Sequence, residues 1–178
     1  MIPIVPAAGK RGAFRSGDLS FDGPVPVMIG DRDLRDALLD AYNLTGDDEP
    51  IALLDIDGFE SDFLNNEMVK EIRIKKRDLL FITYIRDSED VISALTGSFS
   101  GLGIPLNTVR GDDVLTDALS LSEYVFPVVF SRDDREIASG EAVYRISDRM
   151  RKLGFGRMMV IDTVHLSAEM MPLTALVN

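Results

Sequence analysis

The chain has 178 residues, of which 46% are hydrophobic and 28% charged, as expected of one globular domain spanning residues 1–178. It contains no cysteine and one histidine, which excludes disulfides, thiolate catalysis and cysteine- or histidine-rich metal sites. Acidic residues outnumber basic ones by 30 to 19, and the net charge is −11. Because nucleic acids and anionic membranes attract basic surfaces, neither is expected as a partner. No apolar run is long enough to span a membrane and no signal peptide is recognisable, which favours a cytoplasmic protein.

Six short, nearly continuous apolar runs are expected to be strands. Such runs are typical of strands that are buried on both faces, as in parallel sheets. The runs are Ile2–Val5, Ile51–Asp55, Leu79–Ile85, Gly103–Asn107, Tyr124–Phe130 and Arg157–Asp162. The chain thus reads as successive strand–helix units, for which a right-handed parallel sheet is the default.

Helices are expected between these strands, because apolar residues recur there at helical spacing. The expected helices cover Leu34–Ala41, Glu67–Ile72, Asp87–Leu95, Asp113–Leu121 and Ala142–Leu153. Asp31 and Asp33 are candidate caps of the first, and Asp87 opens the third. Gly154 is expected to end the last helix.

The stretch Gly9–Pro26 is expected to be a long irregular loop, because it is rich in glycine and proline. Its beginning, Ala7-Ala8-Gly9-Lys10-Arg11, offers backbone N–H groups and cations to a phosphate. This opening resembles that of sugar-phosphate nucleotidyltransferases, although Val25 stands where that family has a lysine. A solvated loop is the alternative interpretation.

Acidic residues follow several of the expected strands, at the edge where α/β proteins place their chemistry. Asp57, Asp133 and Asp162 are candidate catalytic residues, since carboxylates exchange protons or orient substrate hydroxyls. Asp55 and His165 lie beside them in the sequence and are candidate supporting residues. The alternative is that these acids cap loops and that His165 is a surface residue.

Arg86 and Thr108 are candidate phosphate-binding residues. Arg86 precedes the start of an expected helix, where a guanidinium and free N–H groups suit a phosphate. An ion pair with Asp87, Glu89 or Asp90 is the alternative. Thr108 offers a hydroxyl after the fourth expected strand, where a simple turn explains it equally well.

These segments together resemble the ProFAR isomerase (HisA/HisF-like) family of phosphate-binding (βα) barrels. Ile85–Val91 is similar to the segment that follows that family's third strand. Ile2–Pro6, Leu54–Gly58 and Gly154–Asp162 resemble its first, second and sixth strand segments. The resemblance implies a barrel that binds phosphates at its carboxyl edge, with Asp133, or in another register Ser131, in place of the second catalytic aspartate.

The chain also departs from the family pattern. Pro6 stands where the family has its first catalytic aspartate, and Thr83 and Tyr84 replace the glycines before the arginine. A full barrel takes about 250 residues, whereas here only Ala168–Asn178 follow the sixth strand. We therefore expect an incomplete HisA-like barrel with about six parallel strands; an open doubly wound sheet is the alternative. Exposed strand edges would then predict a homo-oligomer, such as a homodimer, or another partner that covers them.

The expected function is binding of a phosphorylated small metabolite at the carboxyl edge of the strands, without ordinary ProFAR isomerase activity. Gly101-Leu-Gly103 lies between a helix and a strand, which is the wrong order for a dinucleotide fingerprint, so no cofactor is expected. A non-catalytic structural or interaction subunit is the alternative, and a nucleotidyltransferase-like protein is a third hypothesis. The sequence leaves open whether the protein is an enzyme.

Overall fold

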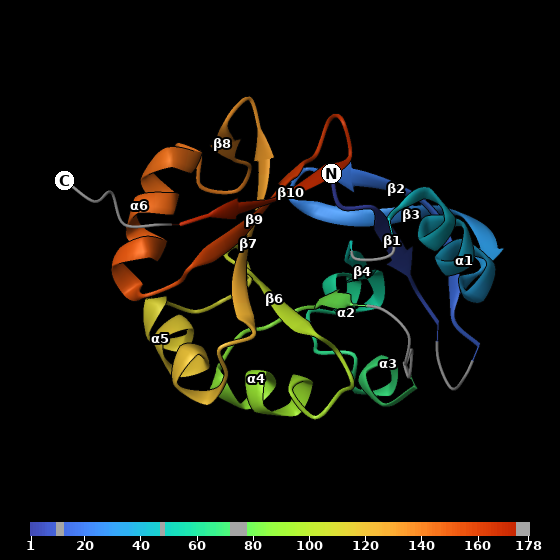
Figure 1. Ribbon diagram of the computed structural model, residues 1–178, viewed down its shortest axis with the longest axis horizontal. Coiled ribbons are helices and arrows are strands. Elements are labelled where there is room, and N and C mark those ends of the chain that lie inside the picture. The colour runs from blue at the N-terminus through green and yellow to red at the C-terminus, as the bar shows by residue number, and fades with distance from the viewer. Residues whose placement is uncertain (10–12, 47–48, 72–77, 174–178) are drawn as a thin grey trace.

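The computed structural model describes residues 1–9, 13–46, 49–71 and 78–173 (Figure 1). All six predicted strands are present, and each pairs in parallel with the next along the chain. They are β1 (Ile4–Ala7), β4 (Ile51–Asp55), β5 (Leu79–Ile82), β6 (Gly101–Pro105), β7 (Val125–Arg132) and β9 (Arg157–Asp162). The prediction of an α/β fold is confirmed, and the sheet is curled (Figure 1). Its strand order follows the chain without the reversal that defines a doubly wound sheet.

Two further strands run antiparallel to their neighbours and were not predicted. β8 (Arg135–Glu136) pairs with β7, and β10 (Ser167–Pro172) continues the sheet after β9. Ala168 of β10 also forms an antiparallel bridge with Ile2, whose N–H donates to the Ala168 oxygen at 2.8 Å. The two ends of the curled sheet therefore meet at one point. A homo-oligomer stays a prediction. The argument for it is weaker, because the contact between Ile2 and Ala168 partly covers the strand edges at the two ends of the sheet.

The five predicted helices are present, and most of their starts and ends lie within one residue of the predicted bounds. They are α1 (Leu34–Leu44), α2 (Ile56–Ser61), α3 (Asn66–Glu71), α4 (Ser88–Ala94), α5 (Asp112–Leu121) and α6 (Val143–Leu153). Asp33 and Asp87 cap α1 and α4 as predicted, and Gly154 ends α6 with a φ of 111°. α2 was not predicted, and Ile72 lies outside the described residues. Among the described residues, no helix is long and apolar enough to cross a membrane.

The prediction that Gly9–Pro26 is an irregular loop is wrong. Much of it forms a hairpin of β2 (Arg15–Asp22) and β3 (Val25–Asp33). The turn is made by Gly23 and Pro24, and Gly23 has a φ of 58°, which glycine adopts without strain. Lys10 and Arg11, the cations of the predicted phosphate loop, lie outside the described residues.

The sheet separates two apolar cores. The outer core lies between the sheet and the helices, and its members include Leu53, Phe81 and Met158. The inner core fills the concave side of the sheet, where Phe126 and Phe130 are almost fully buried. Successive side chains of each strand point alternately into the two cores, so both faces of the strand are buried. This explains why the strands read as continuous apolar runs.

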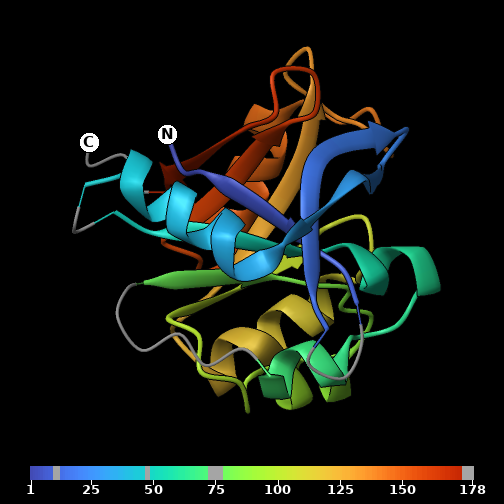
Figure 2. The same ribbon diagram turned by 90° about the vertical axis from the view of Figure 1, so that its right-hand side faces the viewer.

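The β2–β3 hairpin covers the inner core at the carboxyl ends of the strands. Leu19, Phe21 and Met28 pack against that core, and the Phe21 and Phe130 rings lie 5.2 Å apart, nearly edge to face. At the hairpin tip, the Asn107 side chain donates to the Pro24 oxygen at 3.4 Å. Figure 2 shows the hairpin rising beside the sheet from the end of β1. Apolar side chains of the hairpin thus occupy the mouth at which a barrel enzyme would hold its substrate.

Candidate functional site

Asp55 is a fully buried carboxylate at the carboxyl end of β4. One oxygen, Oδ1, accepts from the Gly58 N–H and from the Asn65 side-chain amide, both at 3.2 Å. The other, Oδ2, accepts from the Thr83 hydroxyl at 2.9 Å. Burial raises the pKa of Asp55 to about 6, although these hydrogen bonds oppose the shift. Through these bonds Asp55 fastens the start of α2 to Thr83, the residue that follows β5.

Asp57 joins two segments that are far apart in the sequence. Its Oδ2 accepts from the Gly9 N–H at 2.6 Å, at the point where the chain leaves β1 for the hairpin. Gly9 has a φ of 128°, and a Cβ there would lie 2.3 Å from the Ala13 oxygen, so only glycine fits. The contact of Asp57 is therefore the one that the loop-capping alternative predicts. A catalytic role of Asp57 stays a prediction.

Asp133 and Asp162 lie in two different hairpin turns. Asp133 and Asp134 form the two-residue turn between β7 and β8, with φ angles of 51° and 60°. Asp162 ends β9 and accepts from the Val164 and His165 N–H groups at 2.8 and 2.9 Å. These N–H groups and the nearby imidazole, whose Nδ1 lies 3.1 Å from Oδ2, hold the Asp162 pKa below its usual value.

The predicted catalytic acids are thus distributed over separate loops. Within the described part of the chain, no hydrogen bond joins Asp57, Asp133 and Asp162 to one another. No group of three or more acidic or histidine side chains there is arranged to hold a metal ion. The imidazole of His165 is largely exposed, and its partner is Asp162 in the same turn.

Arg86 follows β5 and is held by α4. The Asp90 carboxylate accepts from the Arg86 N–H at 2.9 Å and lies 3.4 Å from its Nε, so the predicted alternative pairing is present. The guanidinium carbon lies 4.8 Å from the centroid of the Phe63 ring. No hydrogen bond or ion pair joins the two terminal Nη atoms to another described residue. The fork that recognises carboxylates and phosphates is therefore not used within the described part of the protein.

Thr108 and Arg110 lie on the neighbouring loop, after β6. The Thr108 hydroxyl donates to the Ile85 oxygen at 2.7 Å and lies 3.1 Å from the Pro105 oxygen, so its single hydrogen is already used. The Arg110 N–H donates to the Arg86 oxygen at 3.0 Å. Two hydrogen bonds thus fasten the loops after β5 and β6 together, and they place Arg110 beside Arg86.

Thr83 and Tyr84, at the positions where the resembled family has glycines, fill space instead of opening it. Thr83 is fully buried against Asp55, and the Tyr84 ring packs edge-on against Phe59 with centroids 5.9 Å apart. Burial, followed by the charge of Asp62, raises the pKa of the Tyr84 phenol. The phenol therefore keeps its proton at neutral pH and remains a hydrogen-bond donor near Arg86.

The structure brings together only part of the predicted site. Arg86 and Thr108 are joined by the loop contacts, whereas His165 and the turn of Asp133 belong to separate hairpins. Sequence reasoning missed Arg110, which is exposed and has no side-chain partner among the described residues. Its position just before the start of α5, two residues after Thr108, was the available signal.

The sequence matches no model of a known protein family, and a search of curated proteins found no significant similarity.

Proposed function

We propose that the protein binds a small phosphorylated molecule at the loops after β5 and β6, through Arg86 and Arg110. The observation that carries this proposal is the hydrogen bond from the Arg110 N–H to the Arg86 oxygen. It joins the backbones of two arginines, on the loops that follow neighbouring strands, at the carboxyl edge where α/β folds bind their ligands.

The hydrogen-bond donors that the two guanidinium groups leave free within the described part of the chain support an anionic ligand. The same loops and helix starts also carry Asp87, Glu89, Asp90, Asp112 and Asp113, so this support does not come from the net charge of the region. Asp90 contacts the Nε of Arg86 and leaves the terminal Nη atoms to donate elsewhere. Arg110 has no carboxylate partner among the described residues. A phosphate dianion accepts bidentate hydrogen bonds from guanidinium groups, so arginine suits this ligand better than lysine does.

The proposal does not include isomerase chemistry on the concave side of the curled sheet. That reaction needs an acid and a base on opposite sides of one substrate. Here Pro6 takes the place of one acid, and its oxygen accepts from the Ser16 hydroxyl of the hairpin at 2.6 Å. Phe21 and its neighbours pack over the inner core, where the substrate of such a reaction would lie. These features favour a binding protein over an isomerase.

Thermal unfolding with inorganic phosphate, ribose 5-phosphate and ribose tests the proposal. A ligand at about ten times its Kd stabilises the native state by about 1.4 kcal/mol, or roughly 3–6 °C in Tm for a chain of this size. We expect a shift of this order with ribose 5-phosphate and none with ribose. Arg86→Ala and Arg110→Ala should each remove the shift, whereas Arg35→Ala, on the exposed side of α1, should retain it.

Two further results complete the design. Arg86→Lys keeps the charge but loses the fork, so it should weaken binding less than Arg86→Ala does. A shift that persists in both alanine variants would overturn the proposal, as would the absence of any shift with phosphate compounds in the wild type.

A further inference from the structure

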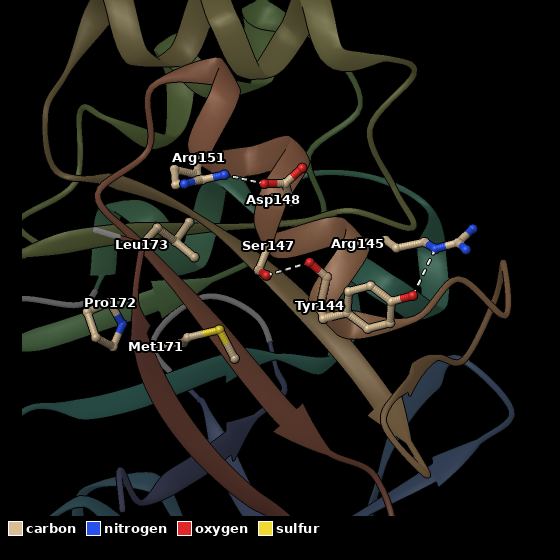
Figure 3. A pocket seen from close by; sticks show the side chains of 8 residues that line it. All are labelled: Tyr144, Arg145, Ser147, Asp148, Arg151, Met171, Pro172 and Leu173. Carbon is tan, nitrogen blue, oxygen red and sulfur yellow. Dashed lines mark hydrogen bonds and ion pairs between the residues drawn. The ribbon is translucent and has the colours of Figure 1, made fainter. Parts of the chain in front are cut away.

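A groove of about 430 Å³ lies between α6 and β10, away from the loops of the proposed phosphate site. Figure 3 shows its two walls. Tyr144, Ser147 and Arg151 line it from the helix, and Met171 and Leu173 line it from the strand and the residue that follows. Residues 174–178 lie outside the described residues. The volume falls within the range of about 300–1,000 Å³ that is typical of small-molecule sites.

The helix wall is basic in an otherwise acidic protein. α6 carries three arginines and one lysine but only one carboxylate, that of Asp148. Both Arg151 and Lys152 contact Asp148, so two cations share one anion and a positive charge remains. The Arg145 Nε donates to the Tyr144 hydroxyl at 3.2 Å, and no ion pair links Arg145 to a described carboxylate.

The strand wall is apolar. Leu173 is buried and Met171 is partly buried, and both belong to the outer core. The Tyr144 side chain, 68% exposed, adds an aromatic face at the edge of the groove. An apolar wall opposite cationic groups matches a ligand with an apolar body and an anionic head.

We propose that this groove binds a small organic carboxylate with an aromatic or aliphatic body. The body contacts Met171, Leu173 and the Tyr144 ring, while Arg145 or Arg151 donates to the carboxylate. A guanidinium binds a carboxylate through two parallel hydrogen bonds, which favours such a head group over a neutral one. This site is independent of the proposed phosphate site, and the failure of either proposal leaves the other unaffected.

The test is a titration of the full chain followed by amide NMR, with 1-naphthoate as the aromatic probe and octanoate as the aliphatic one. Neutral 1-naphthalenemethanol is the matched control ligand. We expect one of the acids to shift the amides of α6 and β10 and the neutral alcohol to bind more weakly. Which acid binds more tightly identifies the body that the groove accepts.

Three variants locate the site. The double variant Arg145→Gln/Arg151→Gln should raise the Kd of the acid about fivefold or more, as the loss of a partly exposed charge contact predicts. Ser147→Glu adds a like charge between the walls and should abolish binding while its amide spectrum remains that of a folded protein. Arg149→Gln is the matched control on the same helix and should leave Kd unchanged. Arg149 pairs with Asp112 and Glu141 and is not among the residues that line the groove. Equal binding in all variants, equal binding of the alcohol, or no binding of either acid would overturn the proposal.

Discussion

Replacing Asp55 by asparagine should stabilise the protein at neutral pH and remove one component of its pH dependence. Asp55 is fully buried, and burial raises its pKa from 3.8 to about 6. The native state therefore binds this proton more tightly than the unfolded state does. The stabilisation from this proton is complete below pH 3.8 and is lost as the pH rises through 6. The difference between the two pKa values corresponds to about 3 kcal/mol in the free energy of unfolding.

Asparagine is a suitable replacement because the site can accept its amide. Its oxygen can accept from the Gly58 N–H and the Asn65 amide as Oδ1 now does, and its NH₂ group can donate to the Thr83 hydroxyl. We therefore expect Asp55→Asn to resemble the wild type near pH 3.5 and to exceed it by up to about 3 kcal/mol at pH 7.

The assay is urea unfolding of both proteins at several pH values between 3.5 and 7. The difference between the two free energies isolates Asp55, because the other carboxylates are common to both proteins. Glu123→Gln, at an exposed position, controls for the loss of one negative charge and should give a small, flat difference. A difference between wild type and Asp55→Asn that stays constant or shrinks from pH 4 to 7 would refute the reasoning.

Three other perturbations test the fold. Phe21→Ala should lower the unfolding free energy by about 2 kcal/mol, because the ring is partly buried against the inner core, and urea unfolding measures this. Gly9→Ala should lower it by more than about 1 kcal/mol, since the added Cβ meets the Ala13 oxygen, whereas Gly156→Ala, with open space around it, should be tolerated. Asp162→Asn should destabilise the protein slightly at pH 7, and the loss should vanish as acid protonates Asp162 in the wild type, because the native-state pKa of Asp162 is lowered. An Asp162→Asn loss that does not shrink as the pH falls below 3.8 would contradict this.

Much of the sheet was predictable because burial on both faces leaves a direct signal in the sequence. Ile51–Asp55 and Arg157–Asp162 are strands with the predicted bounds. β10 was missed because only Ala168 and Met170 of its six residues face the inner core, so it shows no continuous apolar run. Its position depends on pairing with β9, which a local pattern does not reveal.

The hairpin was missed for a different reason. Its glycines and prolines suggest a loop, yet the alternation at Leu19 and Phe21 is that of a strand with one buried face. Phe21 packs against Phe130, a contact between distant parts of the chain.

The candidate site was predictable in its residues more than in its geometry. Arg86 and its pairing with Asp90 follow from their spacing of four residues. The proximity of Arg110 to Arg86 depends on β5 and β6 being neighbours and on the hydrogen bond between their loops. The burial of Asp55, which raises its pKa, likewise depends on residues that only the fold brings together.

The most direct test of the central claim is an amide NMR titration of the wild-type chain with ribose 5-phosphate. We predict that the shifts concentrate at residues 84–87 and 107–111, on the loops after β5 and β6, and that Arg110→Ala suppresses them. Shifts confined to other loops, or no shifts at about 20 mM ligand, a concentration that would half-saturate even a very weak site, would contradict the account.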